Sequence, residues 1–220
     1  MSKKVHVLGQ TILQYETPEF ILNELNKIYD EKEEKELPPA NTQLSGKIKD
    51  EFILYHNEMD NPSKSFNRVS AKTIDWFITQ FIDYLHLVER PSVQKSKDIR
   101  VSSMWVNEMR AGEYNPIHVH ASKFSSVGLS SVMMLKFPSN YGKEYSRPDI
   151  ALNGQLQFVG SAGGQFSCTD YTPNVKIGDF FIFPYDMRHV VYPFNTTKEL
   201  RRTLSANADV FYNTVFIPHK

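Results

Sequence analysis

Three histidines in the second half of the chain have the spacing expected of a metal site. His118 and His120 form an H-x-H pair, and residues two apart in a strand point to the same side, so both imidazoles can reach one point. Imidazole binds iron, zinc, copper and nickel, but such a site needs a third ligand. His189 opens an apolar segment just after Phe183-Pro184, where it would face a barrel interior. An isolated H-x-H pair is commonly a surface feature, so the hypothesis depends on His189.

A basic residue downstream indicates a second role for the same site. Arg201 begins a strand-like segment in which Thr203 and Ser205 follow at i+2 and i+4, and all three lie on one side of a strand. A guanidinium with neighbouring hydroxyls is suited to bidentate capture of a carboxylate. Beside the strand of His189, Arg201 would hold the far carboxylate of a small diacid bound to the metal, with Arg202 facing outward. A surface pair of basic residues is the alternative on spacing alone.

Helical signals dominate before Lys97. Thr17 is a plausible N-cap and Pro18 suits the first helical position, so we expect a helix that runs into the charged stretch 30–36. A second helix has one wide apolar face, which we expect to pack against the back of a sheet. Its residues recur at helical spacing: Ile74, Phe77, Ile78, Phe81, Leu85 and Val88.

Short runs rich in β-branched and aromatic residues follow Lys97 and alternate with turn residues. They predict strands over 100–109, 127–137, 155–159, 179–183, 189–192 and 202–212. Because no helices intervene, the pattern favours a sandwich or barrel over a parallel sheet with crossover helices. The fold class is therefore mainly β with flanking helices. We expect residues 1–97 to form a helical and strand elaboration packed on a core of residues 98–220, together one structural domain.

Composition excludes several classes of function. Lys+Arg and Asp+Glu balance at 25 each, so bulk positive charge does not hold nucleic acid, and nothing specific indicates a nucleic-acid partner. Cys168 is the only cysteine, which indicates a reducing, cytoplasmic location. No signal peptide or apolar membrane span is recognisable, so we expect a soluble protein without a membrane partner. The sequence leaves a homo-oligomer open.

Taken together, these segments resemble a family of 2-oxoglutarate-iron(II) oxygenases with an H-x-H core, which are distant relatives of the prolyl hydroxylases. The resemblance extends over about half of the chain, from residue 105 to residue 207. It is carried by residues 105–107, 112–120, 178–184, 189–194 and 201–207. Each segment is weak alone, but their order and spacing together are specific.

The resemblance implies a double-stranded β-helix (a jelly-roll, cupin-like core) that binds Fe(II), with 2-oxoglutarate and dioxygen as co-substrates. The implied activity is that of a dioxygenase, hydroxylase-like, which couples oxidative decarboxylation of 2-oxoglutarate to oxidation of an unidentified primary substrate. No catalytic residue is expected beyond the metal site. The resemblance implies the metal ligands His118, His120 and His189 and the co-substrate residues Arg201 and Thr203. Ser205 joins the co-substrate residues by its spacing along the strand, and Trp105, Asn107 and Asn207 are candidates for the pocket lining.

Two departures from the wider superfamily are visible. His120 stands where most members have Asp, so three neutral imidazoles leave the site one negative charge short. Members of the family often carry a Tyr on the strand after H-x-H, and residues 131–135 contain none.

Two alternative functions follow from these departures. One is a three-histidine metal enzyme that does not use 2-oxoglutarate, for which zinc or nickel would also suit the ligands. The other is a non-catalytic jelly-roll for binding or assembly with a vestigial metal site. Residues 36–67 and 142–164 are polar and loop-like, and we expect them to frame the pocket.

Overall fold

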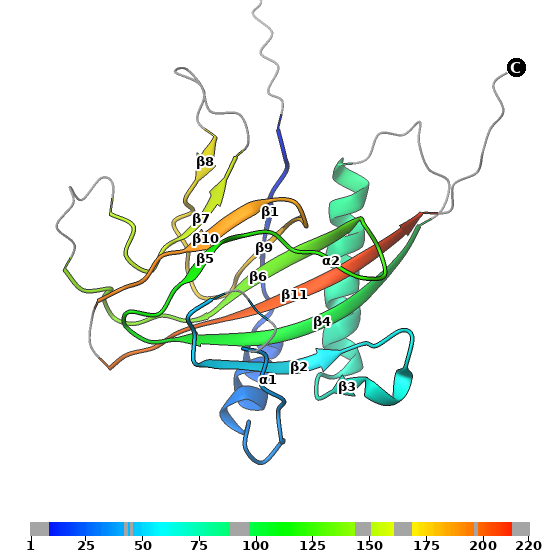
Figure 1. The fold of residues 1–220 in the computed structure, drawn as a ribbon, viewed down its shortest axis with the longest axis horizontal. Coiled ribbons are helices and arrows are strands. Elements are labelled where there is room, and N and C mark those ends of the chain that lie inside the picture. The colour runs from blue at the N-terminus through cyan, green and yellow to red at the C-terminus, as the bar shows by residue number, and fades with distance from the viewer. Residues whose placement is uncertain are drawn as a thin grey trace, which may run out of the picture.

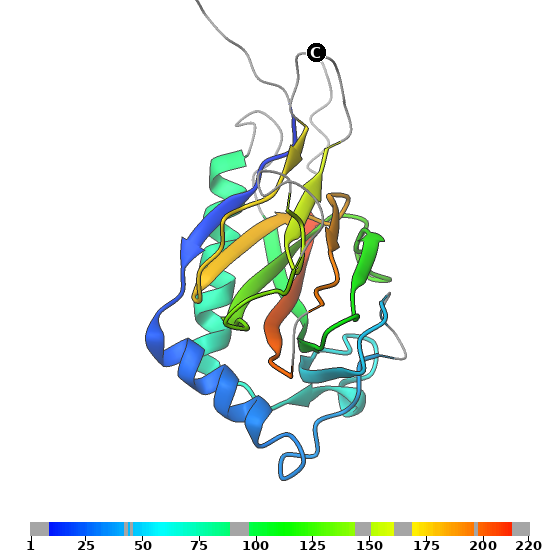
Figure 2. The same ribbon diagram turned by 90° about the vertical axis from the view of Figure 1, so that its left-hand side faces the viewer.

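Two antiparallel β-sheets face each other, and two helices cover the outer face of the larger sheet (Figures 1 and 2). This computed structural model describes residues 9–41, 44, 46–88, 97–143, 151–160, 169–195 and 198–212. The arrangement is the jelly-roll implied by the resemblance, so the predicted fold class is confirmed. None of the helices in these ranges is long and apolar enough to cross a bilayer.

The larger sheet has seven strands in the order β1-β9-β6-β11-β4-β2-β3. Its centre is β11, which pairs with β4 on one side and with β6 on the other. The strands are β1 (Leu13–Glu16), β2 (Asp50–His56), β3 (Phe66–Asn67), β4 (Lys97–Met109), β6 (Gly128–Lys136), β9 (Asp179–Pro184) and β11 (Arg201–Tyr212).

The smaller sheet has four strands in the order β5-β10-β7-β8. They are β5 (Asn115–His118), β7 (Leu156–Val159), β8 (Asp170–Tyr171) and β10 (Arg188–Val191). Strand β5 carries His118 and β10 carries His189, and these two residues are direct partners in the antiparallel register. The smaller sheet therefore brings together two residues that are 71 positions apart in the sequence.

Alternation along β11 separates two environments. Arg202, Leu204 and Ala206 face the helices, whereas Arg201, Thr203 and Ser205 face the smaller sheet, because successive side chains of a strand point to opposite faces. Eight of its twelve residues are buried, as expected for a central strand covered on both faces. The polar residues of the inner face are the ones that could perform chemistry.

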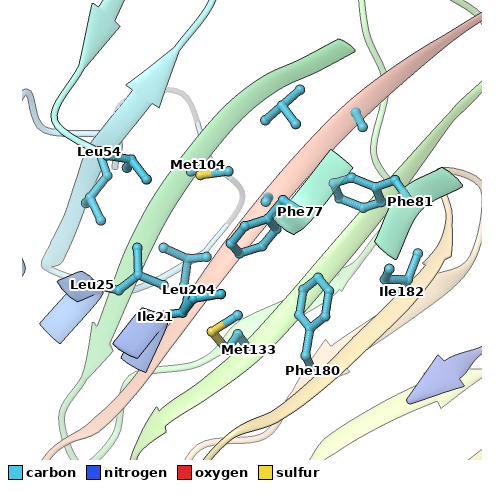
Figure 3. Close-up of a cluster of buried hydrophobic side chains, with 14 of the residues drawn as sticks. Ile21, Leu25, Leu54, Phe77, Phe81, Met104, Met133, Phe180, Ile182 and Leu204 are labelled. Atoms are coloured by element: carbon cyan, nitrogen blue, oxygen red, sulfur yellow. The ribbon is translucent and has the colours of Figure 1, made fainter. Parts of the chain in front are cut away.

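The helices cover the outer face with an apolar cluster. Helix α1 (Glu19–Asp30) contributes Ile21 and Leu25, and helix α2 (Ala71–Val88) contributes Phe77 and Phe81. Figure 3 shows these side chains against residues of β4, β6, β9 and β11. The ring of Phe180 packs edge-on against Phe77 at a centroid distance of 5.1 Å. The packing of the second helix on the back of the sheet is thus confirmed.

A second apolar cluster fills the space between the two sheets. It includes Phe181 and Phe183 of β9 and Phe158 of β7. The rings of Phe158 and Phe183 meet edge-on at 5.0 Å, and Phe183 also contacts the ring of His189 at 4.8 Å. This cluster gives His189 an apolar surrounding on the side that faces the larger sheet.

The six predicted strands are confirmed within a few residues, but the prediction that 36–67 is loop-like is wrong. That segment contains β2 and β3, and β2 pairs with β4 over six residue pairs as part of the main sheet. The first helix ends at Asp30, the first residue of the charged stretch, and its N-cap is Pro18 rather than Thr17. The division at residue 97 stays a prediction, since β1 and β2 join strands of the predicted core.

Candidate metal centre

The three predicted histidines form one cluster. His118, His120 and His189 each offer a ring nitrogen, and these nitrogens lie within 4.8 Å of one another. The Nε2 atoms of His120 and His189 are 3.3 Å apart. Metal–nitrogen bonds of about 2.0–2.1 Å place adjacent ligand atoms roughly 3 Å apart. The cluster therefore has dimensions that could accept a metal ion.

Backbone carbonyl groups orient two of the rings. The Nδ1 of His118 lies 2.7 Å from the carbonyl oxygen of Pro116, and the Nδ1 of His189 lies 3.0 Å from that of Met187. A carbonyl oxygen only accepts, so each Nδ1 carries the proton and each Nε2 keeps its lone pair. A hydrogen bond of this kind on the far ring nitrogen is typical of metal-binding histidines.

Burial keeps the histidines neutral. It lowers the pKa of His189 to about 3, with a further contribution from the neighbouring His118. It also lowers the pKa of His118, and it lowers that of His120 well below the usual value, where His189 and His118 add to the effect. Neutral imidazole is the form that binds a metal ion, so at neutral pH protons do not compete for the cluster.

Arg201 is fully buried without an anionic partner among the described residues. The guanidinium Nη1 and Nη2 lie 3.8 and 3.9 Å from the thioether sulfurs of Met109 and Met134. Its Nε has no hydrogen-bond partner, and burial lowers the pKa of the group. A buried cation normally pairs with an anion, because leaving it alone costs several kcal/mol. The surroundings of Arg201 therefore suit a carboxylate ligand.

Tyr141 also reaches this arginine, and the sequence did not identify it. Burial lowers the pKa of Arg201, and the neighbouring Tyr141 hydroxyl acts in the opposite direction. The Tyr141 ring packs edge-on against Phe194 and fills the space beside Gly154, where an added Cβ would lie 2.2 Å from a ring carbon. The expected Tyr is absent from the strand after H-x-H, but a tyrosine from the following loop occupies the interior.

The hydroxyl residues lie beside Arg201 on the same face of β11. Thr203 is 3% exposed, and its strand neighbours are Asn107 and Met134. Ser205 accepts a 3.2 Å hydrogen bond from the Asn107 side chain, whose Oδ1 is buried without a partner. The structure thus places the predicted co-substrate residues in one row along the inner face.

Trp105 and Asn207 line a cavity of about 270 Å³ next to the H-x-H pair, as do His118 and His120. The Trp105 ring lies 6.1 Å from that of His120. The segment 36–67 contributes to the wall, as predicted, although two of its contributors belong to a strand. The other wall residues include Ala40, Leu44, Ile53, His56, Ser103 and Asn115. In the second predicted framing segment, 142–164, residues 144–150 and 161–164 lie outside the described part of the chain, and Leu156–Val159 form β7.

The spacing predicted that Arg202 faces outward to solvent, and this prediction is wrong. Arg202 is 6% exposed and lies between the large sheet and α1. Its guanidinium donates to Glu108, Asn26 and Asp30 at 2.8 Å each, and it stacks over the Tyr29 ring. The two adjacent arginines thus differ in kind: Arg202 has its anions within the chain, and Arg201 has none among the described residues.

Glu51 is a buried acid that the sequence did not identify. It lies on β2 opposite Asn107, is 2% exposed, and its Oε1 has no partner. Burial, with a contribution from Glu113, raises the pKa of this carboxyl to about 7. An acidic residue within a long polar segment gives no sequence signal for this position.

Replacing Glu51 with Gln should flatten the dependence of stability on pH. Between pH 4.5, the ordinary value, and about pH 7, folded Glu51 keeps a proton that the unfolded chain releases. Stability therefore falls as pH rises through this window, by about 3 kcal/mol in total. Urea unfolding at pH 5 and pH 7.5 should show a smaller loss for Glu51→Gln than for the wild type. Equal losses would contradict the assignment.

The fold and the histidine cluster define a class of protein. It is a jelly-roll in which three histidines could hold a metal, and it also has a buried arginine that has no counterion among the described residues. Residues 103–207 match the model of a family described as "Putative 2OG-Fe(II) oxygenase". This segment of 105 of the 220 residues is therefore similar to a 2OG-Fe(II) oxygenase domain, and the name of the family states a metal and a co-substrate. No curated protein sequence matches the chain.

Solved structures with the same fold include several oxygenases. A prolyl-4-hydroxylase from Pseudomonas putida is 14% identical, with a TM-score of 0.55 over 91% of this chain and 92% of that one. A Trichoplax adhaerens prolyl hydroxylase, solved with a hypoxia inducible factor peptide, is 11% identical, with a TM-score of 0.53 over 91% and 83%. The nogalamycin carbocyclase SnoK is 12% identical, with a TM-score of 0.56 over 93% and 82%. At these identities the likeness shows the fold.

Proposed function

We propose that this chain is an Fe(II)- and 2-oxoglutarate-dependent dioxygenase of the hydroxylase type, with His118, His120 and His189 as its metal ligands. When bound, Fe(II) and 2-oxoglutarate supply oxidative decarboxylation of the co-substrate by dioxygen, coupled to oxidation of a substrate C–H bond. A cytoplasmic location, expected from the single cysteine, would keep the iron ferrous.

The donor set fits iron. Imidazole nitrogens suit Fe(II), and three protein ligands leave positions open for other ligands. All three rings are neutral, and two are held by backbone carbonyls with Nε2 free. The same donors suit zinc, so the assignment of iron rests on the family match over 103–207.

One observation carries the co-substrate assignment: the buried guanidinium of Arg201 has no anionic partner within the described chain. We infer that Arg201 and Tyr141 hold the distal carboxylate of 2-oxoglutarate. A charge-assisted hydrogen bond contributes about 1.5–3 kcal/mol to such binding. Thr203 and Ser205 lie along the same strand face, and we assign them to the side of the co-substrate.

The cavity beside the H-x-H pair is the proposed entry for the primary substrate. Trp105 and Asn207 form part of its wall, close to His120. The apolar cluster between the sheets, including Phe183 and Phe158, keeps water from the other side of the histidines. A dry interior protects the reacting groups from bulk water and strengthens their electrostatic interactions.

Replacing His189 with Ala should abolish stoichiometric iron binding, because two remaining imidazoles do not form a complete site. Protein loaded with Fe(II) without oxygen and passed through a desalting column should carry one iron per chain for the wild type and almost none for the variant. His86→Ala is the matched control, since His86 is an exposed residue of α2. Stoichiometric iron in His189→Ala would show that the ligand set is wrong.

Product formation separates the proposal from its two rivals. With Fe(II), dioxygen and 2-oxoglutarate, the wild type should release succinate, and His189→Ala should not. A three-histidine enzyme that does not use 2-oxoglutarate would bind metal without succinate formation. A vestigial site would bind no metal at all.

A further inference from the structure

Glu51 is a buried carboxyl group that the metal centre does not use. Its neighbour Phe52 packs with the apolar cluster on the helix side of the sheet, and successive residues of a strand point to opposite faces. Glu51 also pairs in register with Asn107, whose side chain reaches Ser205 on the inner face of β11. The side chain of Glu51 therefore lies on the face of the large sheet that looks toward the smaller sheet.

The neighbours of Glu51 line the cavity beside the H-x-H pair. Ile53, two residues further along the same face of β2, forms part of the wall. Ala40, another wall residue, donates its backbone N–H to the carbonyl oxygen of Glu51 at 2.8 Å. Asn115 of β5 lines the cavity from the side of the smaller sheet, and the nearby charge of Glu113 acts on Glu51. Glu51 thus lies beside the end of the cavity at which β2 and β5 begin.

This carboxyl group lacks a positive partner among the residues that the structure describes. Glu51 is 2% exposed, and its Oε1 has no hydrogen-bond partner. The charged group that acts on it, Glu113, has the same sign, and the cation of this region, Arg110, is paired with Asp50. A buried ionised carboxylate is stable only when it is paired or hydrogen-bonded. The surroundings of Glu51 therefore suit a cationic ligand.

Two carboxamide groups of the same region are also incompletely bonded. Asn107 donates to Ser205 through one end, and the other end is buried without a partner. Asn115 likewise has a buried side-chain oxygen without a partner. The cavity wall, as far as the chain is described, includes no lysine or arginine that would repel a cation. A group that combines positive charge with several N–H donors would satisfy this set of polar atoms.

We propose that Glu51 is a specificity-determining residue that receives a positively charged nitrogen group, an ammonium or a guanidinium, of the primary substrate. The inference rests on the proposed function, in which this cavity admits that substrate. The cation supplies the counter-charge that Glu51 lacks, and its several N–H groups can also reach the neighbouring carboxamides. Trp105, which pairs in register with Ile53 and lines the same cavity, adds an aromatic ring that attracts cations.

Binding of such a cation is coupled to the ionisation of Glu51. Burial and the charge of Glu113 raise the pKa of this carboxyl to about 7, so it is mostly protonated at pH 6 and mostly ionised at pH 8. Only the ionised form attracts a cation. An alkylammonium group, with a pKa of about 10.4 like that of lysine, stays charged throughout. The affinity for it should therefore rise about 10-fold between pH 6 and pH 8.

The test measures the binding of n-butylammonium, n-butylguanidinium and the uncharged n-butanol to the full chain, with and without Zn(II), by NMR titration. At pH 8 a cation should bind the wild type about 10-fold or more tightly than n-butanol, the effect of one charge-assisted hydrogen bond. Glu51→Gln should lose this preference and its pH dependence, and keep the affinity for n-butanol. Glu19→Gln is the matched control, since Glu19 is an exposed acid of α1, and it should behave as the wild type.

Three results would overturn the inference. They are equal affinities of the folded wild type for the cations and n-butanol, equal cation affinities of the wild type and Glu51→Gln, and a cation affinity that does not change with pH. The pH readout needs no variant, so it decides even where Glu51→Gln is unfolded. Any contribution of His56, which also lines the cavity, is the same in both proteins.

Failure of the proposed function gives a different result. A wild type that binds no Fe(II), or that releases no succinate with Fe(II), dioxygen and 2-oxoglutarate, would overturn the oxygenase. Binding of n-butylammonium through Glu51 would still be measured in that protein, because the cation site consists of side chains that are not metal ligands.

Discussion

Replacing Arg201 with Met should weaken 2-oxoglutarate binding roughly 10- to 150-fold, the loss of about 1.5–3 kcal/mol of charge-assisted hydrogen bonding. The same change should leave the stability of the metal-free protein unchanged or higher, since a buried cation without an anion is replaced by an apolar side chain. Met suits the site because Met109 and Met134 already surround the guanidinium. Calorimetric titration of the metal-loaded protein without oxygen measures the affinity, and urea unfolding measures the stability.

Two controls accompany the measurement on Arg201→Met: a second variant at the same position and the metal content of each protein. Arg201→Lys keeps the charge but loses the planar fork, so its affinity should lie between those of the wild type and Arg201→Met. Metal stoichiometry should be the same in all three proteins, because Arg201 is not among the proposed ligands. A marked loss of stability in Arg201→Met with unchanged 2-oxoglutarate affinity would contradict the prediction, because it would show that Arg201 stabilises the fold and does not bind the co-substrate.

Replacing the adjacent Arg202 with Met should destabilise the fold by about 3–5 kcal/mol, because it leaves the buried carboxylate of Glu108 without its partner. Arg202 and Glu108 are both about 7% exposed at the side chain, and their charged atoms are 2.7 Å apart. The contact with Asp30 matters less, since that side chain is 62% exposed. Urea unfolding at pH 7 measures the change.

The double variant Arg202→Met with Glu108→Met provides the control. Removing both charges should recover most of the lost stability, because apolar side chains replace a buried ion pair at little cost. Asp30→Asn should cost less than about 1 kcal/mol. If the single and double variants were equally unstable, packing of Arg202 against Tyr29 rather than its charge would account for the loss.

Much of the sheet could be predicted because its strands are covered on both faces. Central strands such as β6 and β9 are rich in apolar residues and bounded by turn residues, and their limits agree with the predictions within a residue. Helical periodicity located α2 because only one face of this helix is buried, and its apolar residues therefore recur at helical spacing. Alternation along β11 suffices to place Arg201, Thr203 and Ser205 on one face, because the side-chain period of a strand is two.

The parts that escaped prediction depend on contacts between distant segments. Strand β2 carries an apolar run, Phe52–Tyr55, inside the otherwise polar segment 36–67, and its pairing with β4 shows that it belongs to the sheet. Tyr141 lies in a loop, and its approach to Arg201 depends on how that loop packs over Gly154. Arg201 and Arg202 lie on opposite faces of β11, and among the described residues only the face of Arg202 offers a carboxylate. The spacing of residues in the sequence does not predict which face that is.

The most direct test of the central claim is an anaerobic titration of the iron-loaded protein with 2-oxoglutarate. A 2-oxo acid that chelates Fe(II) produces a metal-to-ligand charge-transfer band in visible light, which succinate, lacking the keto group, does not. We predict that the band appears with 2-oxoglutarate and saturates at one equivalent, and that Arg201→Met requires a higher concentration. Absence of the band in wild-type protein with one iron bound would contradict the assignment of the co-substrate.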